Sequence, residues 1–217
     1  MVKNPKAILH QCGFTLVEMA VVLVIVGLLL GGLLVPLSVQ RDLKDYGNTK
    51  LSLDQAKEAL YGYALSHSAV DGKPYLPCPD TDQDGYENRA GADCDEDIGD
   101  LPTGDLGLQR TDAWDNRFRY RVSPDFASSA TGFILSHSGN ITVLDNAGDT
   151  VVSGIPALIL SSGKNGAGAP ASPGEAENAD TDATFVSHEH TDTFDDLVVW
   201  LSTSVLMNRM VTAGQLP

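Results

Sequence analysis

The sequence predicts an α+β protein, in which a long N-terminal helix packs on a C-terminal antiparallel β-sheet domain. Residues 14–37 are almost wholly apolar, and residues 38–68 repeat apolar side chains at helical spacing. From residue 69 to residue 217, short β-type runs alternate with clusters of Gly, Pro, Asp and Asn. A helix followed by a series of strands is the α+β order of elements, and 217 residues suffice for one anchor and one globular domain.

The apolar run from Phe14 to Leu37 is the first element. As a helix it measures about 36 Å at ~1.5 Å per residue, which is enough to span a bilayer. Lys3 and Lys6 precede it and favour a cytoplasmic N-terminus, with the rest of the chain outside. Its single charge, Glu18, costs roughly 2.5–3.5 kcal/mol at the centre of a membrane helix, so Glu18 either reaches the interface or meets a cation.

Residues 38–68 read as an amphipathic continuation of this helix, whose apolar face packs on the globular domain. Gly47 and Asn48 fall at the one break in the pattern and are a candidate kink. The apolar stripe consists of Leu43, Tyr46, Leu53, Ala56, Leu60 and Ala64.

The remaining residues predict a sheet with one long connection. The stretch 162–196 is rich in Gly, Ala, Ser and Asp and is expected to be a long surface loop. The predicted strands are 118–122, 132–138, 141–145, 157–162 and 197–202.

Charge and cysteine content restrict the partners and the compartment. The chain has 14 Lys and Arg against 29 Asp and Glu, and a net charge of −15 repels phosphate backbones, so direct nucleic-acid binding is not expected. Cys12 precedes the apolar run, whereas Cys78 and Cys94 lie in the predicted domain. We expect these two to form a disulfide on the oxidising side of a membrane.

The segment between these two cysteines resembles a calcium-binding loop. Alternating carboxylates followed by a glycine allow oxygen ligands to converge on one hard cation. The twelfth position holds Gly91 where a bidentate glutamate is expected, and the alternative is a solvated acidic loop. The candidate calcium ligands are Asp80, Asp82, Asp84, Tyr86 (through its carbonyl) and Asn88.

Two further groups are weaker metal candidates. His188 and His190, with Glu189 and Asp192, have the donors for a transition metal, although two histidines in an acidic loop are more often simply surface residues. A second possible calcium group consists of Glu175, Glu177, Asp180 and Asp182.

The stretch "GFTLVEMAVVLVIVGLLL" resembles the leader junction of type IV pilin and type II secretion pseudopilin precursors. The resemblance implies that residues 1–13 are a leader, that prepilin peptidase cuts after Gly13, and that the new N-terminus on Phe14 is methylated. It also implies that Glu18 of one subunit meets the amine on Phe14 of a neighbouring subunit during assembly. A buried pair of this kind suits the setting of register.

A second resemblance covers residues 101–122, where "DAWDNRFRY" is similar to the stretch that enters the sheet in pseudopilins. Asp115 stands where glycine is usual and Arg117 where proline is usual, which weakens an assignment to the major pseudopilin. The sequence contains no recognisable catalytic constellation, so we expect a protein that is not an enzyme.

These observations predict a structural subunit, a minor pilin or pseudopilin, of a type II secretion pseudopilus or a type IV pilus. Its expected partners are other subunits, prepilin peptidase and the bacterial inner membrane, which it crosses once with the domain in the periplasm before assembly. Calcium is its expected cofactor. The alternative is a pilus-tip adhesin or calcium-dependent surface-binding pilin, with residues 162–196 as the contact surface.

Overall fold

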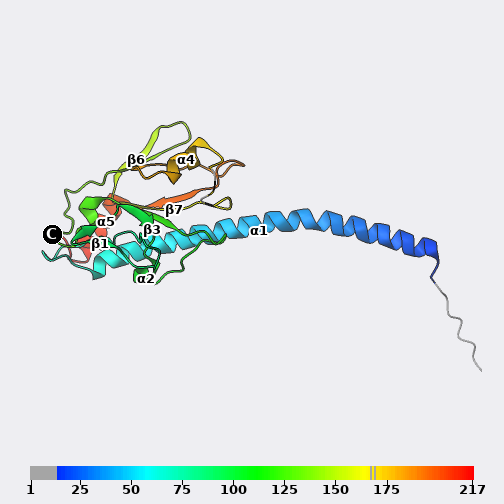
Figure 1. Cartoon of the computed structure of the whole chain (residues 1–217), viewed down its shortest axis with the longest axis horizontal. Coiled ribbons are helices and arrows are strands. Elements are labelled where there is room, and N and C mark those ends of the chain that lie inside the picture. The colour runs from blue at the N-terminus through cyan, green and yellow to red at the C-terminus, as the bar shows by residue number, and fades with distance from the viewer. Residues whose placement is uncertain (1–13, 167, 169) are drawn as a thin grey trace, which may run out of the picture. The chain divides into compact units, whose positions relative to one another are not determined.

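A computed structural model describes residues 14–166, 168 and 170–217, and for residues 32–38 it describes the backbone alone. The chain divides into two compact units, Met1–Lys44 and Asp45–Pro217, and helix α1 (Leu16–Ser66) passes from the first into the second (Figure 1). The predicted leader, residues 1–13, lies outside the described residues. A long N-terminal helix followed by β-sheets confirms the predicted α+β class.

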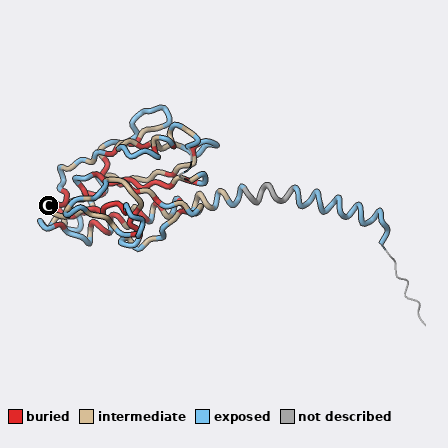
Figure 2. Tube along the Cα trace, viewed as in Figure 1, coloured by how far each residue is buried: buried red, intermediate tan, exposed pale blue. Residues whose placement is uncertain are grey.

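In the first unit, the described part of α1 exposes its apolar side chains. Phe14 is 83% exposed and Leu16 is 90% exposed, and the residues up to Leu30 are exposed as well (Figure 2). Over the part of the chain that the structure describes, no helix has the combined length and apolar character that a membrane crossing requires. The membrane span predicted over residues 14–37 stays a prediction.

In the second unit, α1 continues without interruption to Ser66, so Gly47 and Asn48 do not break it. Leu53, Ala56 and Leu60 are fully or almost fully buried, as the predicted stripe requires. Leu43, by contrast, lies in the first unit and is exposed.

A four-stranded antiparallel sheet forms the centre of the second unit. Its order is β3-β4-β7-β9, and each neighbouring pair is antiparallel. Its strands are β3 (Ile98–Asp100), β4 (Arg119–Val122), β7 (Ala157–Ser161) and β9 (Leu197–Trp200).

A three-stranded sheet lies over one face of the first and has the order β6-β5-β8. The pairing of β5 with β6 is antiparallel, whereas β5 pairs with β8 in parallel. Its strands are β5 (Ile141–Leu144), β6 (Thr150–Ile155) and β8 (Thr184–Val186), and a separate hairpin joins β1 (Arg89–Ala90) to β2 (Asp93–Cys94).

Alternation along the central strands creates two cores. Ile159 of β7 faces the core formed with α1, whereas its neighbours Leu158 and Leu160 face the core shared with the three-stranded sheet. In β9, Val199 and Val198 divide between the two cores in the same way. The central sheet is therefore covered on both faces.

The second unit also contains short helices, and its structure corrects two predictions that were made from the sequence. Residues 132–138 form no strand, because a turn closes between Ile134 and His137 after the buried Phe133. The stretch 162–196 is not a plain loop, since it contains the helix α4 (Pro173–Ala179) and the strand β8. The short helices are α2 (Thr103–Leu106), α3 (Pro124–Ala127), α4 (Pro173–Ala179) and α5 (Thr203–Thr212).

Candidate functional site

The start of α1 is closed by a capping box formed by Thr15 and Glu18. The backbone N–H and the hydroxyl of Thr15 both donate to Oε2 of Glu18, at 2.8 and 2.9 Å, and the N–H of Glu18 donates to Thr15 Oγ1 at 3.3 Å. The box satisfies backbone donors that the first turn of a helix leaves without partners. The Thr-x-x-Glu spacing is visible in the sequence, and our sequence interpretation missed it. Gly13, the predicted cleavage residue, lies outside the described residues.

Cys78 and Cys94 form a disulfide, the pair that the sequence predicts. Cys78 is fully buried and belongs to the core against α1, and Cys94 closes the β1–β2 hairpin. The bond closes a loop with a sequence separation of 16 residues. The segment that carries the predicted calcium ligands is thus closed at both ends.

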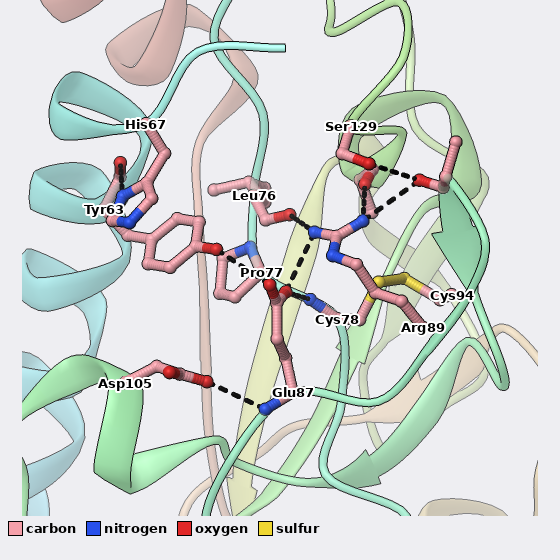
Figure 3. Close-up of polar contacts among 12 residues, drawn as sticks. Tyr63, His67, Leu76, Pro77, Cys78, Glu87, Arg89, Cys94, Asp105 and Ser129 are labelled. Carbon is pink, nitrogen blue, oxygen red and sulfur yellow. Dashed lines mark hydrogen bonds and ion pairs between the residues drawn. A yellow bond between two sulfur atoms is a disulfide. The ribbon is translucent and has the colours of Figure 1, made fainter. Parts of the chain in front are cut away.

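Glu87 attaches this loop to α1, and Arg89 attaches it to neighbouring segments of the second unit, as Figure 3 shows. The Glu87 carboxylate accepts hydrogen bonds from the hydroxyl of Tyr63 on α1 at 3.1 Å and from the N–H of Cys78 at 2.8 Å, and it pairs with Arg89 at 2.8 Å. Arg89 also lies over the ring of Tyr75, 4.9 Å from its centroid. Half-buried charges that are paired and hydrogen-bonded in this way fix the position of the loop.

Within the loop, Asp80 is 3% exposed and its carboxylate is occupied by backbone groups. Oδ1 accepts the N–H of Gln83 at 2.7 Å, and Oδ2 accepts the N–H of Gly85 at 2.8 Å. Gly85 has φ +101°, and Gln83 adopts the left-handed region at φ +69°. The loop therefore closes around the Asp80 carboxylate through its own amides.

The structure brings together three of the five predicted ligands. Carboxylate oxygens of Asp80, Asp82 and Asp84 lie within 4.8 Å of one another. The amide oxygen of Asn88 instead accepts the N–H of Thr81 at 2.7 Å, so it serves to close the loop. The side chain of Tyr86 is exposed.

A second cluster of carboxylates combines Glu175 on α4 with Asp195 and Asp196, which directly precede β9, and its oxygens also lie within 4.8 Å of one another. Glu175 is 5% exposed, and Asn165 donates to both of its oxygens at 3.0 and 3.1 Å. Asp196 accepts a hydrogen bond from Asn178 at 2.8 Å. The Oδ1 atom of Asp195 is buried and has no hydrogen-bond partner among the described residues.

Burial and like charge shift the pKa values of this second cluster. Burial raises the pKa of Asp196 to about 7, and the negative charges of Glu175 and Asp195 act in the same direction. Burial also raises the pKa of Asp195. For Glu175, burial acts to raise the pKa, but hydrogen bonds from Ala171, Asp195 and Asn165 outweigh it and leave the pKa lowered.

The other two predicted metal groups are not found with the members that the sequence predicts. Glu175 does not join Glu177, Asp180 and Asp182, which form a third and largely exposed cluster. The ring of His188 stacks on Phe194 with 3.8 Å between centroids, and the ring of His190 lies 6.0 Å from that of Tyr46. In the described chain, neither histidine belongs to a group of three close metal-ligating side chains.

The stretch that resembles pseudopilins forms a tight turn before β4. Asp112 accepts the N–H groups of Trp114 and Asn116, each at 2.9 Å, and the hydroxyl of Ser161 at 2.6 Å. Asp115 lies in the left-handed region at φ +68°, which explains why glycine is usual at this place. The departure from the usual residue thus costs strain but preserves the turn.

Comparison with known proteins gives one match, at the N-terminus. A family model described as the prokaryotic N-terminal methylation motif matches residues 8–34. The chain carries the hallmark of type IV pilin and pseudopilin precursors. No curated protein and no solved structure matches the chain. The motif implies processing by prepilin peptidase and assembly with other pilin subunits, and it points to a structural role.

Proposed function

We propose that this chain is a minor pilin or pseudopilin, a structural subunit of a type II secretion pseudopilus or a type IV pilus. The observation that carries the proposal is the methylation motif over residues 8–34 at the start of α1. The apolar side chains of α1 that are exposed from Leu16 to Leu30 support it, because a continuous apolar helix surface needs lipid or other helices to cover it.

The compartment follows from the same features. We propose that the precursor is held in the inner membrane with its N-terminus in the cytoplasm and its second unit in the periplasm, before it enters the filament. Lys3 and Lys6 support this orientation, and a disulfide between Cys78 and Cys94 is stable in the oxidising periplasm.

The first test is cleavage. We expect Gly13→Ala to block removal of the leader, because a methyl group in place of hydrogen obstructs the peptidase at the cut site. The precursor and the mature chain are distinguished by mass spectrometry of membrane fractions. Mature protein in wild-type amounts from the Gly13→Ala variant would remove the leader assignment.

The second test separates two roles of Glu18, the capping box seen in the structure and the proposed pair with the amine of a neighbouring Phe14. Glu18→Gln keeps an oxygen that accepts the cap hydrogen bonds but removes the charge. Thr15→Ala removes the hydroxyl part of the cap and leaves the charge, at a cost of about 1 kcal/mol. If pairing is the main role, Glu18→Gln lowers incorporation into filaments at least tenfold and Thr15→Ala has little effect.

The readout is the amount of mature chain in the sheared filament fraction relative to the membrane fraction. Glu18→Ala, which loses the carboxylate part of the cap together with the charge, serves as the reference for loss of the Glu18 side chain. Normal assembly of Glu18→Gln together with poor assembly of Thr15→Ala would assign the residue to the helix cap and contradict the pair.

We also propose that calcium binds the second unit, and that the partly buried cluster of Glu175, Asp195 and Asp196 is its better site. Each oxygen of the Asp80 carboxylate already accepts one backbone N–H group. The partly buried cluster holds three carboxylates close together, including an oxygen of Asp195 that lacks a partner in the described chain. Buried like charges are costly unless a cation or a proton offsets them.

A further inference from the structure

An acidic groove of about 700 Å³ runs between the start of the disulfide loop and the segment that leads into β3. Its walls include five carboxylates. Two of them are occupied, since Asp80 accepts backbone amides and Asp100 pairs with Arg117 at 2.9 Å. The other three are consecutive in the chain: Asp95, Glu96 and Asp97.

The side chains of these three residues are at least partly exposed to solvent. Asp95 and Glu96 are exposed and Asp97 is half-buried. The backbone of Asp95 donates to Asn88 and the carbonyl of Asp97 accepts from Val122, so the backbone of the segment is fixed while its carboxylates stay available. No salt bridge given for the described residues includes them.

Arg121 adds a donor at the same groove. It is 7% exposed and lies on β4, and its Nη1 donates to the carbonyl of Thr181 at 2.7 Å. Its Nε is buried and finds no acceptor among the described residues. Arg121 itself lines the groove beside the carboxylates, so an occupant that brings an acceptor as well as cations fits this groove best.

Most cationic side chains of the described chain already form an ion pair or a hydrogen bond. Arg89, Arg117 and Arg209 form ion pairs, as do Lys57 and Lys73. Arg110, Arg119 and Arg121 donate to carbonyl groups, and Lys164 also has a partner. The exposed cations that remain without one among the described residues are Arg41, Lys44 and Lys50, all on α1.

We propose that residues 41–45 of α1 from a second copy of this chain dock in the acidic groove. Arg41 and Lys44 of that copy meet Asp95 and Glu96, and Asp45, which follows Lys44 directly, supplies an acceptor to Arg121. Positions i, i+3 and i+4 of a helix are neighbours on its surface, so these three side chains reach one partner together. Charge complementarity of this kind fixes the register between subunits more than it adds affinity.

The inference rests on the proposed function, and its test uses full-length chains in the native secretion or pilus system. One variant reverses the helix charges (Arg41→Glu with Lys44→Glu), and another reverses the groove (Asp95→Lys with Glu96→Lys). Each is expressed alone, and then both are expressed together with different epitope tags. Incorporation is measured in the sheared filament fraction, and leader cleavage and thermal melting check that each variant matures and folds.

When each variant is expressed alone, we expect its amount in the filament fraction to be lower than that of wild type by a factor of roughly five or more. Each variant places like charges opposite one another. Co-expression should restore both to within about twofold, because the acidic helix of one copy then meets the basic groove of the other. Complementation between two chains also separates this contact from one within a single chain.

The matched control for the groove variant is Glu189→Lys with Asp192→Lys. It also replaces two acidic residues by lysine, but at exposed positions outside the groove, and it should assemble normally. An equal loss in this control would mean that net charge, not the groove, is responsible, and would overturn the inference. Normal assembly of each reversed variant alone, or no recovery on co-expression, would overturn it too. Absence of the wild-type chain from filaments would instead reject the proposed function.

Discussion

The two acidic clusters of the second unit use their carboxylates in opposite ways. In the disulfide loop, Asp80 is buried but each of its oxygens accepts a backbone amide of the same loop. Near the C-terminus, the carboxylates of Glu175, Asp195 and Asp196 converge from separate elements, and burial raises the pKa of Asp196 to about 7. In the first cluster, backbone N–H groups of the same loop hydrogen-bond the buried carboxylate. The second cluster carries negative charge that its surroundings do not fully offset.

The difference shows that the spacing of carboxylates along a chain is a weak guide to where a cation is needed. A motif on a tight loop supplies acceptors and N–H donors from the same few residues, and the donors can satisfy the carboxylate. In the second cluster, Glu175 also accepts backbone N–H groups, from Ala171 and Asp195, but the Oδ1 atom of Asp195 has no hydrogen-bond partner among the described residues. The need for a cation is therefore greater where the sequence pattern is less visible.

The largest expected effect comes from the covalent closure of the disulfide loop. Replacing Cys78 and Cys94 by serine should lower the free energy of unfolding by about 3 kcal/mol, because the unfolded chain gains the entropy of an open loop. Chemical denaturation of the full chain in detergent measures the loss.

The same variant sharpens the comparison when it is studied by hydrogen exchange. Amides of residues 79–94 should exchange faster, whereas those of residues 172–196 should keep their protection, since hydrogen bonds through Glu175 and Asn178 hold that region. Equal loss of protection in both regions would show that the two clusters belong to one cooperative unit.

The second effect is the response to calcium. At a calcium concentration of 100 times the dissociation constant, the free energy of unfolding should rise by about 2.7 kcal/mol. Glu175→Gln combined with Asp195→Asn should abolish the increase, because these changes remove two of the three clustered charges. Thermal melting in calcium chloride and in a chelator measures it.

The control for this experiment is Asp82→Asn combined with Asp84→Asn, which removes two charges from the disulfide loop and should leave the calcium response intact. The opposite pattern, with the response lost only in the loop variant, would assign calcium to the sequence motif. An identical melting temperature with and without calcium in wild type would reject calcium binding at either cluster.

The sequence predicted much of the fold, and its errors have local causes. Regular spacing of Leu53, Ala56 and Leu60 predicted the helical stripe because all three face one core. Strand β8 was missed because a three-residue strand with one buried side chain, Phe185, has no repeat to detect. The run at 132–138 misled because apolar residues also occur in turns, and Ile134 and Leu135 there are exposed.

The candidate site divides in the same way. The processing motif and the disulfide were predicted because each depends on residue identity or on a small number of cysteines. The cluster at Glu175 was predicted with the wrong members, because Asp195 and Asp196 join it only when β9 is placed beside β7. The adjacent aspartates before an apolar run, "DDLVVW", were the available signal, and only tertiary structure gives it meaning.

The smallest expected effect concerns strain in the disulfide loop. Gln83 adopts φ +69° while its N–H donates to Asp80 and its carbonyl accepts from Arg110. A residue with a Cβ atom in this region of φ costs roughly 1–2 kcal/mol, and glycine removes that cost. Glycine in turn lowers stability by about 0.5–1 kcal/mol, because it has more conformational entropy to lose when the chain folds. Gln83→Gly should therefore stabilise the protein by about 0.5 kcal/mol, measured by chemical denaturation.

Gln83→Ala is the matched control and should bring no gain, because alanine keeps the Cβ that causes the strain. The gain from Gln83→Gly should be the same with calcium and with a chelator if backbone amides alone hold the Asp80 loop. A gain that appears only in calcium would mean that the strained conformation is the one that an ion selects, and the contrast between the two clusters would then disappear.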